Sequence, residues 1–258
     1  MTTPVLNKPF IARGSRTHRC PECLLAIRVC ICSYRTSAQG DASFVLLMHH
    51  NESFKPTNTG RLIADCFPDT KIFEWSRTQP PLTFLALLND TSYQPYLVFP
   101  AGPGYEDRMV QYPATQKRPL FILLDGTWRQ ARRMFRLSKY LQHLPVITLP
   151  QTARTSRYHL RQSATPEQLC TAEIAAELLH LIGDHTAGDL LMAYFDVFNE
   201  HYRAARLTRP LQAEMPAKQF ILGLQTVASG LQHKGDRSVI DQTDLHVCTK
   251  PACCNSRV

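Results

Sequence analysis

Residues 120–136 read LFILLDGTWRQARRMFR, and this stretch decides the fold that we predict. Its first five residues form a continuous apolar run, which is typical of a strand buried on both faces of a parallel sheet. Asp125 follows at the carboxyl end of the run, and Gly126 permits a tight turn or a close backbone approach to a ligand. Thr127 is a suitable N-cap for a helix that begins at the next residue. The stretch therefore predicts a strand, a turn and a helix, with polar side chains at the edge of the sheet where ligands of α/β proteins bind.

The helix predicted after this turn has one apolar face and one basic face. At helical spacing the following residues share the side that would pack on the sheet: Trp128, Ala131, Met134, Phe135 and Ser138. The other side carries Arg129, Arg132, Arg133 and Arg136. A basic stripe is often only a solvated surface. This one starts at the predicted ligand edge, so we predict that it contacts nucleic-acid phosphates.

Short apolar runs alternate with helical segments over the preceding part of the chain. Besides the run that opens the first stretch, strands are predicted over residues 44–48, 71–75 and 96–99, and helices over residues 59–65 and 82–89. Strands that are separated by helices favour an α/β fold with a parallel sheet.

The chain divides into three parts by composition. Residues 1–40 form a predicted zinc-binding segment, residues 41–230 the main domain, and residues 231–258 a polar tail that we expect to be flexible. The tail ends in three cysteines, Cys248, Cys253 and Cys254, whose role the sequence leaves open.

The later part of the second region is predicted to be mainly helical. One helix is signalled from an N-cap at Thr165, followed by Pro166 at the first helical position, to a stop at Gly183.

Composition and charge limit the classes of function. The chain has 29 Lys and Arg against 21 Asp and Glu, a net charge of +8, which favours a polyanionic partner. It has no apolar run of about 18 residues, so we expect no membrane span. Residues 1–14 lack the apolar core of a secretory signal, so we expect a cytoplasmic protein with reduced cysteines.

Four cysteines lie close together near the start of the chain. Cys20 and Cys23 form a CxxC pair, and Cys30 and Cys32 form a CxC pair six residues later. Four thiolates within so short a segment can close a tetrahedral site, so we predict structural zinc. An iron–sulfur cluster and a redox pair are the alternatives, because the CxC spacing is tighter than in typical zinc ribbons.

The D-x-T-W motif formed by Asp125, Thr127 and Trp128, with the strand before it and the CxxC…CxC cluster, resembles the DTW-domain family of tRNA-uridine aminocarboxypropyltransferases. The resemblance covers about residues 18–205. Further blocks fall in the order expected of the family: His49, His50 and Glu52 with Asn58 and Thr59, then Tyr158, Leu160 and Arg161, then Cys170, Thr171, Ala172 and Glu173.

The resemblance implies a fold related to the knotted SPOUT methyltransferases and S-adenosylmethionine as the donor. The transferred group would be 3-amino-3-carboxypropyl, and the acceptor would be N3 of a tRNA uridine, in the variable-loop region. The by-product would be 5′-methylthioadenosine.

The resemblance also implies roles for individual residues. In the motif, Asp125 would either take the proton from uridine N3 or bind the amino group of the donor, Thr127 would hold the donor or a phosphate, and Trp128 would stack on a base or pack in the core. The donor site would contain Leu124, Asp125, Gly126, Thr127, Tyr158, Leu160, Arg161, Thr171 and Glu173. The RNA surface would contain His49, His50, Asn58, Arg157 and the four arginines named above.

Two other functions compete with this interpretation. One is an RNA methyltransferase that uses the same donor. The other is a non-enzymatic zinc-ribbon protein that binds RNA, which would explain the charge and the cysteines but not the Asp125 turn. A redox protein that uses the CxxC pair is a weaker third possibility.

Overall fold

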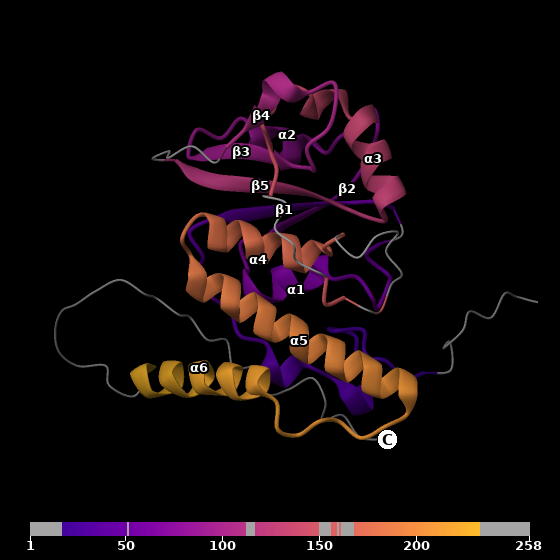
Figure 1. Ribbon diagram of the computed structural model, residues 1–258, viewed down its shortest axis with the longest axis vertical. Coiled ribbons are helices and arrows are strands. Elements are labelled where there is room, and N and C mark those ends of the chain that lie inside the picture. Colours follow the sequence, from indigo (N-terminus) through magenta and orange to yellow (C-terminus); the bar gives the residue numbers. More distant parts are fainter. Residues whose placement is uncertain are drawn as a thin grey trace, which may run out of the picture.

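A computed structural model describes residues 17–50, 52–111, 117–149, 156–158, 160 and 168–232 (Figure 1). Within these ranges the chain has the predicted α/β fold, in which helices cover both faces of a sheet. The described part of the sheet has six strands, and every pairing between them is parallel.

The predicted strands are all present. The sheet consists of β1 (Ser43–Met48), β2 (Lys71–Glu74), β3 (Tyr93–Val98), β4 (Met109–Val110), β5 (Arg118–Asp125) and β6 (Val146–Ile147). Their order is β2-β1-β5-β3-β6-β4, so β5, which contains the LFILL run, lies between β1 and β3. Strands β4 and β6 were not predicted, because two residues are too few to show a strand period.

The helices are α1 (Gly60–Cys66), α2 (Leu82–Leu88), α3 (Trp128–Leu137), α4 (Thr171–Leu181), α5 (His185–Leu207) and α6 (Pro216–Gln232). Single turns of 3-10 helix occur at η1 (Ile27–Val29), η2 (Cys32–Tyr34), η3 (Glu106–Arg108) and η4 (Lys139–Leu141). The helices predicted over residues 59–65 and 82–89 correspond to α1 and α2, and the described residues after 167 are mainly helical, as predicted.

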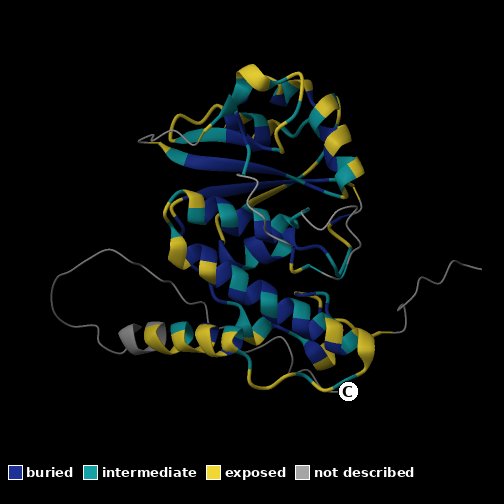
Figure 2. Ribbon diagram, in the orientation of Figure 1, coloured by how far each residue is buried: buried dark blue, intermediate teal, exposed yellow. Residues whose placement is uncertain are grey.

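Two apolar layers enclose the sheet. Along β1, Phe44 and Leu46 face the layer that contains α1, α4 and α5, while Val45 and Leu47 face the layer that contains α2 and α3. All six residues of β1 are buried, as Figure 2 shows for the centre of the sheet. A strand covered on both sides explains why its sequence is apolar without alternation.

Helix α3 has the two predicted faces. Ala131 and Met134 are buried against the sheet, and the four arginines of the opposite face are exposed. Thr127 caps the helix as predicted, because its hydroxyl accepts from the amide of Gln130 while the Gln130 side chain accepts from the amide of Thr127.

The start predicted for α4 is wrong. The described residues 168–170 are not helical, and the helix begins at Thr171 rather than after Thr165, which lies outside the described residues. Glu173 fixes the true start, because its carboxylate accepts from the amide of Cys170. The stop at Gly183 is confirmed, since this residue has a φ of +89° just beyond the end of the helix.

The cysteine segment packs on the main body of the protein. Leu25, Val29 and Ile31 are buried in the same apolar core as α5, and Arg28 donates to the carbonyl of Ala205 at 2.9 Å. The three cysteines of the predicted tail lie outside the described residues, and α6 continues to Gln232. Among the described helices, none has the length and apolar character that a bilayer crossing requires.

Candidate functional site

Asp125 joins three elements at the carboxyl edge of the sheet. Its side chain is 3% exposed, and one carboxylate oxygen accepts from the hydroxyl of Thr171 at 2.7 Å. The other oxygen accepts from the side-chain amide of Asn58. The carboxylate therefore ties the end of β5 to the loop before α1 and to the first turn of α4, across sequence separations of 67 and 46 residues.

The loop before α1 is shaped to meet this carboxylate. Asn58 is 2% exposed, and its carbonyl oxygen accepts from the backbone amide of Arg61 at 3.0 Å. A β-carbon on Gly60 would lie 3.0 Å from the Asp125 carboxylate, so the first residue of α1 has little space for a side chain. Asn58 therefore supports the site from within, and the RNA contact predicted for it stays a prediction.

Gly60→Ala is expected to lower the free energy of unfolding by about 1 to 2 kcal/mol, because the added methyl group crowds the Asp125 carboxylate. Gly223→Ala on α6 is the matched control, since a β-carbon there meets nothing within 4 Å. The control should be more stable than the wild type by about 0.5 to 1 kcal/mol. Urea unfolding measures both, and equal stabilisation by the two changes would contradict this account.

Glu173 holds a neighbouring segment against the start of α4. Its carboxylate accepts from the hydroxyl of Ser156, the amide of Arg157 and the amide of Cys170, at 2.7, 2.7 and 2.8 Å. Tyr158 in turn donates its hydroxyl to the carbonyl of Thr57, beside Asn58. The carboxylate of Glu173 is thus engaged by protein donors, which leaves the donor contact predicted for it without support.

The structure describes only some of the other residues that were predicted near Tyr158. Leu160 is partly buried against the core, and Arg161 lies outside the described residues. The Arg157 guanidinium is 54% exposed and pairs with Asp196 at 2.9 Å. Burial raises the pKa of Asp196 above its ordinary value, against the opposing effect of Arg157.

His49 lies at the end of β1 and is oriented by the helix cap. Because Gln130 uses its amide oxygen to accept from the backbone of Thr127 at 2.8 Å, its amide nitrogen faces Nδ1 of His49 at 3.2 Å. The Nδ1 atom therefore accepts, and a neutral His49 carries its proton on Nε2. Its backbone amide donates to the carbonyl of Asp125 at 2.9 Å, which fixes the ring beside the site.

Partial burial lowers the pKa of His49 below its usual value near 6.5, although Glu52 opposes the shift. The positive charges of His50, Lys55 and Arg133 lower it further. The site histidine is therefore neutral at pH 7. His50 is exposed and lies 3.1 Å from the carboxylate of Glu74, at the end of the next strand.

Gln130→Glu is expected to raise the pKa of His49, because a carboxylate facing Nδ1 stabilises the imidazolium while glutamate still completes the helix cap. In the wild type, the pKa of His49 is lower in the folded state than in the unfolded state. Its contribution to the stability of the fold is therefore complete at pH values above the unfolded-state pKa. This contribution is lost as the pH falls through the folded-state pKa. NMR titration of the imidazole measures the shift. A variant with unchanged titration would refute the orientation derived above.

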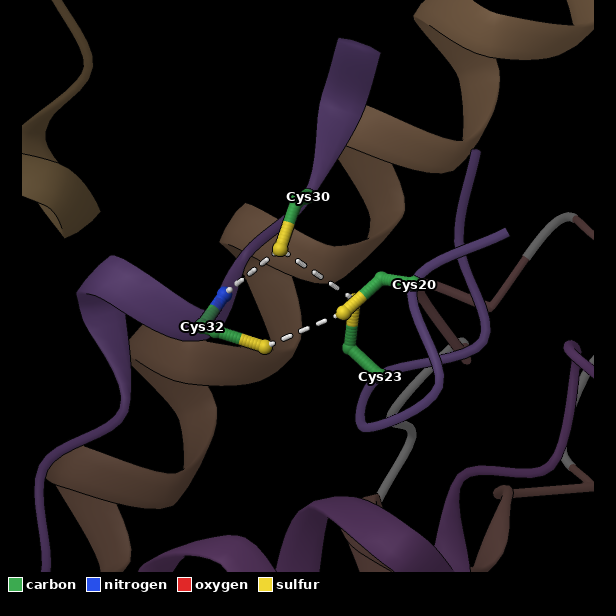
Figure 3. A group of neighbouring side chains, drawn as sticks. All are labelled: Cys20, Cys23, Cys30 and Cys32. Carbon is green, nitrogen blue, oxygen red and sulfur yellow. Dashed lines mark hydrogen bonds between the residues drawn. The ribbon is translucent and has the colours of Figure 1, made fainter. Parts of the chain in front are cut away.

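The four cysteines of the N-terminal segment meet at one point (Figure 3). Their sulfur atoms all lie within 4.8 Å of one another, with Cys20 and Cys32 at 3.6 Å and Cys23 and Cys30 at 3.7 Å. Tetrahedral zinc with bonds of about 2.3 Å separates its sulfur ligands by about 3.8 Å. The donor set could hold a metal ion, and its dimensions fit zinc.

The four thiols lie close enough to affect one another's ionisation. Hydrogen bonding from Cys32 lowers the pKa of Cys23 to about 5, and the same contact raises the pKa of Cys32. The close approach of the sulfurs therefore favours the thiolate at Cys23. A divalent cation would stabilise all four thiolates together.

Comparison with known proteins agrees with this geometry. The DTW domain family matches residues 17–203, which include the cysteine cluster, Asp125 and the first two turns of α4. The chain belongs to this family. Over 214 residues it is 26% identical to tRNA-uridine aminocarboxypropyltransferase 2 of Macaca fascicularis, covering 78% of this chain and 63% of the relative. Over 183 residues it is 25% identical to the Mus musculus protein of the same name, covering 67% of this chain and 59% of the relative. No solved structure matches the chain.

The residues that name the DTW family occupy different environments in this chain. Asp125 is buried, Thr127 is exposed as a helix cap, and Trp128 is half-buried at the start of α3. Gly126 is tightly enclosed, since a β-carbon there would lie 3.1 Å from the side chain of Gln130. Leu124 is half-buried beside them. Sequence reasoning found these positions but missed Gly60, because its role depends on a contact made only in the folded chain.

Proposed function

We propose that this chain transfers the 3-amino-3-carboxypropyl group of S-adenosylmethionine to N3 of a tRNA uridine, in the variable-loop region. Membership of the DTW family and the names of the two relatives, both tRNA-uridine aminocarboxypropyltransferase 2, support the proposal. The observation that carries it is the buried Asp125 carboxylate, which gathers three of the family's sequence blocks at the ligand edge of a parallel sheet.

The reaction forms one bond and breaks one bond. The uridine N3 lone pair attacks the γ-carbon of the aminocarboxypropyl chain, and the carbon–sulfur bond breaks as its electron pair passes to sulfur. The sulfonium becomes the neutral thioether 5′-methylthioadenosine, and the proton of N3 passes to solvent water. The sulfonium offers three carbons, so the protein must select one by position.

We assign Asp125 to the positioning of this site. Its two oxygens are held by Asn58 and Thr171, which favours a structural anchor over the removal of the N3 proton. The same carboxylate sets the loop before α1 and the start of α4, between which we place the donor. A small misplacement of bound reactants is costly, so the anchor matters to the rate without itself reacting.

We place the RNA on the side of α3. Its four arginines are exposed, and the positive charge of Arg133 reaches His49. A neutral His49 with its proton on Nε2 suits a hydrogen bond to a uracil carbonyl or a phosphate rather than proton removal. Because N3 takes part in base pairing, the target uridine must be unpaired or flipped out of the helix.

We propose structural zinc at Cys20, Cys23, Cys30 and Cys32, where it would hold the N-terminal segment in its folded form. The parallel sheet is consistent with the proposed relation to the SPOUT methyltransferases. A cytoplasmic location follows from a tRNA substrate and reduced thiols.

The test is to incubate the purified chain with tRNA and S-adenosylmethionine, digest the RNA and weigh the nucleosides. An aminocarboxypropyl uridine together with 5′-methylthioadenosine supports the proposal. A methylated base, which is much lighter, would instead make the chain an RNA methyltransferase. Unmodified RNA that still binds the protein, with no donor binding, would make it a binding protein.

A further inference from the structure

The cysteine cluster and the Asp125 site are connected by one side chain, that of Arg61. On α1, its guanidinium donates to the carbonyl of Cys23 at 2.7 Å and to the carbonyl of Lys55 at 3.1 Å. Its backbone amide donates to Asn58 at 3.0 Å. Asn58 in turn donates to the Asp125 carboxylate. A continuous series of hydrogen bonds thus runs from a metal-ligating residue to the centre of the candidate site.

The shape of the Arg61 side chain suits this connection. A guanidinium presents its donors in a rigid fork, so it can hold two carbonyls from separate segments at a fixed distance. One of them belongs to the turn of residues 20–24, where the amide of Leu24 donates to the carbonyl of Cys20 and Leu24 adopts a left-handed φ of 58°. The other lies in the loop that leads to Asn58. Displacement of either carbonyl therefore changes the position of the other.

The other arginines of the cysteine segment lead elsewhere. Arg28 donates to the carbonyl of Ala205 at the end of α5. Arg35 pairs with Asp65 at 2.8 Å, near the carboxyl end of α1. Because Arg28 anchors the cysteine segment to α5 rather than to the loop before α1, its replacement is a suitable control for a simple loss of anchoring.

We propose that Arg61 is a positioning residue that couples metal occupancy of the four cysteines to the geometry of the Asn58–Asp125 site. Bound metal would hold the turn at Cys23 in one conformation. The Arg61 guanidinium, which is bonded to the Cys23 carbonyl, would then hold the carbonyl of Lys55 in place. The loop that contains Lys55 would in turn present Asn58 to Asp125. Because such coupling is reciprocal, a ligand that orders the site also tightens metal binding. The coupling to the loop stands independently of the proposed function, whereas the coupling to the donor rests on it.

Hydrogen–deuterium exchange tests the first part without any substrate. Zinc removal by a chelator is expected to speed exchange at the amides of Asn58 and Arg61 at least about tenfold, while the amides of β1 keep their protection. Arg61→Lys keeps the charge but carries its donors on one nitrogen instead of the two that Arg61 uses, so it should hold the two carbonyls less firmly and its loop should exchange fast with or without zinc. Arg28→Ala should behave as the wild type does.

Three results would overturn the coupling. They are an unchanged wild-type loop after zinc removal, a wild-type response in Arg61→Lys, and a simultaneous loss of protection in β1. The third would mean that the metal supports the whole fold rather than this loop. Thermal unfolding of each zinc-loaded variant confirms that it is folded.

A competition experiment tests the reciprocal effect. With a zinc-binding dye as competitor, S-adenosylmethionine should raise the zinc affinity of the wild type at least about fivefold. The effect should fall below about twofold in Arg61→Lys and persist in Arg28→Ala. An equal effect in all three proteins would remove Arg61 from the coupling. Absence of donor binding in the wild type would contradict the proposed function and the donor coupling, while the exchange result would still decide the metal–loop coupling.

Discussion

Asp125→Asn is expected to lower the rate of aminocarboxypropyl transfer about 100-fold and to leave tRNA affinity unchanged. The substitution preserves size but replaces one acceptor oxygen with an amide group, which cannot accept from both Asn58 and Thr171 as the carboxylate does. The loop before α1 and the start of α4 would then shift, and misplacement of this kind costs about two orders of magnitude in rate. Single-turnover transfer at saturating donor and tRNA measures the change.

The opposite edge of the same sheet offers a matched control. Asp69 accepts from the hydroxyl of Ser43 at 2.7 Å and lies 3.4 Å from the guanidinium of Arg118, at the amino ends of β1 and β5. Asp69→Asn therefore disturbs a comparable carboxylate far from the ligand edge and should leave transfer unchanged. Equal losses from both variants would mean that the effect is on the sheet as a whole. Full activity in Asp125→Asn would remove this carboxylate from the mechanism.

Aspartate-to-alanine at the same position is a less informative change. It would leave the buried Asn58 amide without its acceptor, at a cost of about 1 to 3 kcal/mol, and would remove the acceptor of the half-buried Thr171 hydroxyl. Loss of activity could then reflect loss of the folded loop, which the sequence alone could not foresee.

The features that the sequence predicts well are those encoded locally. The LFILL run marks β5 because a strand covered on both faces needs only apolar residues, and the arginine spacing marks the exposed face of α3. The four cysteines could be grouped from their spacing, since the short CxxC and CxC arms keep the members of each pair close and the six-residue loop lets the two pairs face each other.

The features that it missed depend on tertiary contacts. Gly60 looks like an ordinary helix start until Asp125 lies against it, and Gln130 looks like a capping residue until His49 lies beside it. The start of α4 was placed too early because Thr165 and Pro166 form a good local cap, whereas Glu173 makes its own cap with Cys170. Local propensity yields to such tertiary contacts.

Replacing the exposed arginines of α3 is expected to weaken tRNA binding at least about 100-fold in moderate salt. The variant changes Arg129, Arg132, Arg133 and Arg136 to alanine. It lowers Lys plus Arg from 29 to 25 against 21 Asp plus Glu, so the net charge falls from +8 to +4. If all four contact phosphates, the slope of log affinity against log salt should decrease in magnitude by up to about four.

A comparison of pairs separates local contact from overall charge. Arg203 and Arg206 are exposed on α5, and their replacement removes two positive charges away from α3. The pair Arg129 and Arg133 removes the same charge, and Arg133 already acts on His49, so its loss should weaken binding the most. Equal losses from the two pairs would reduce the effect to net charge. Unchanged binding by the α3 variant would place the tRNA on another surface. It would also mean that the basic helix does not bring RNA to the site that Asp125 organises.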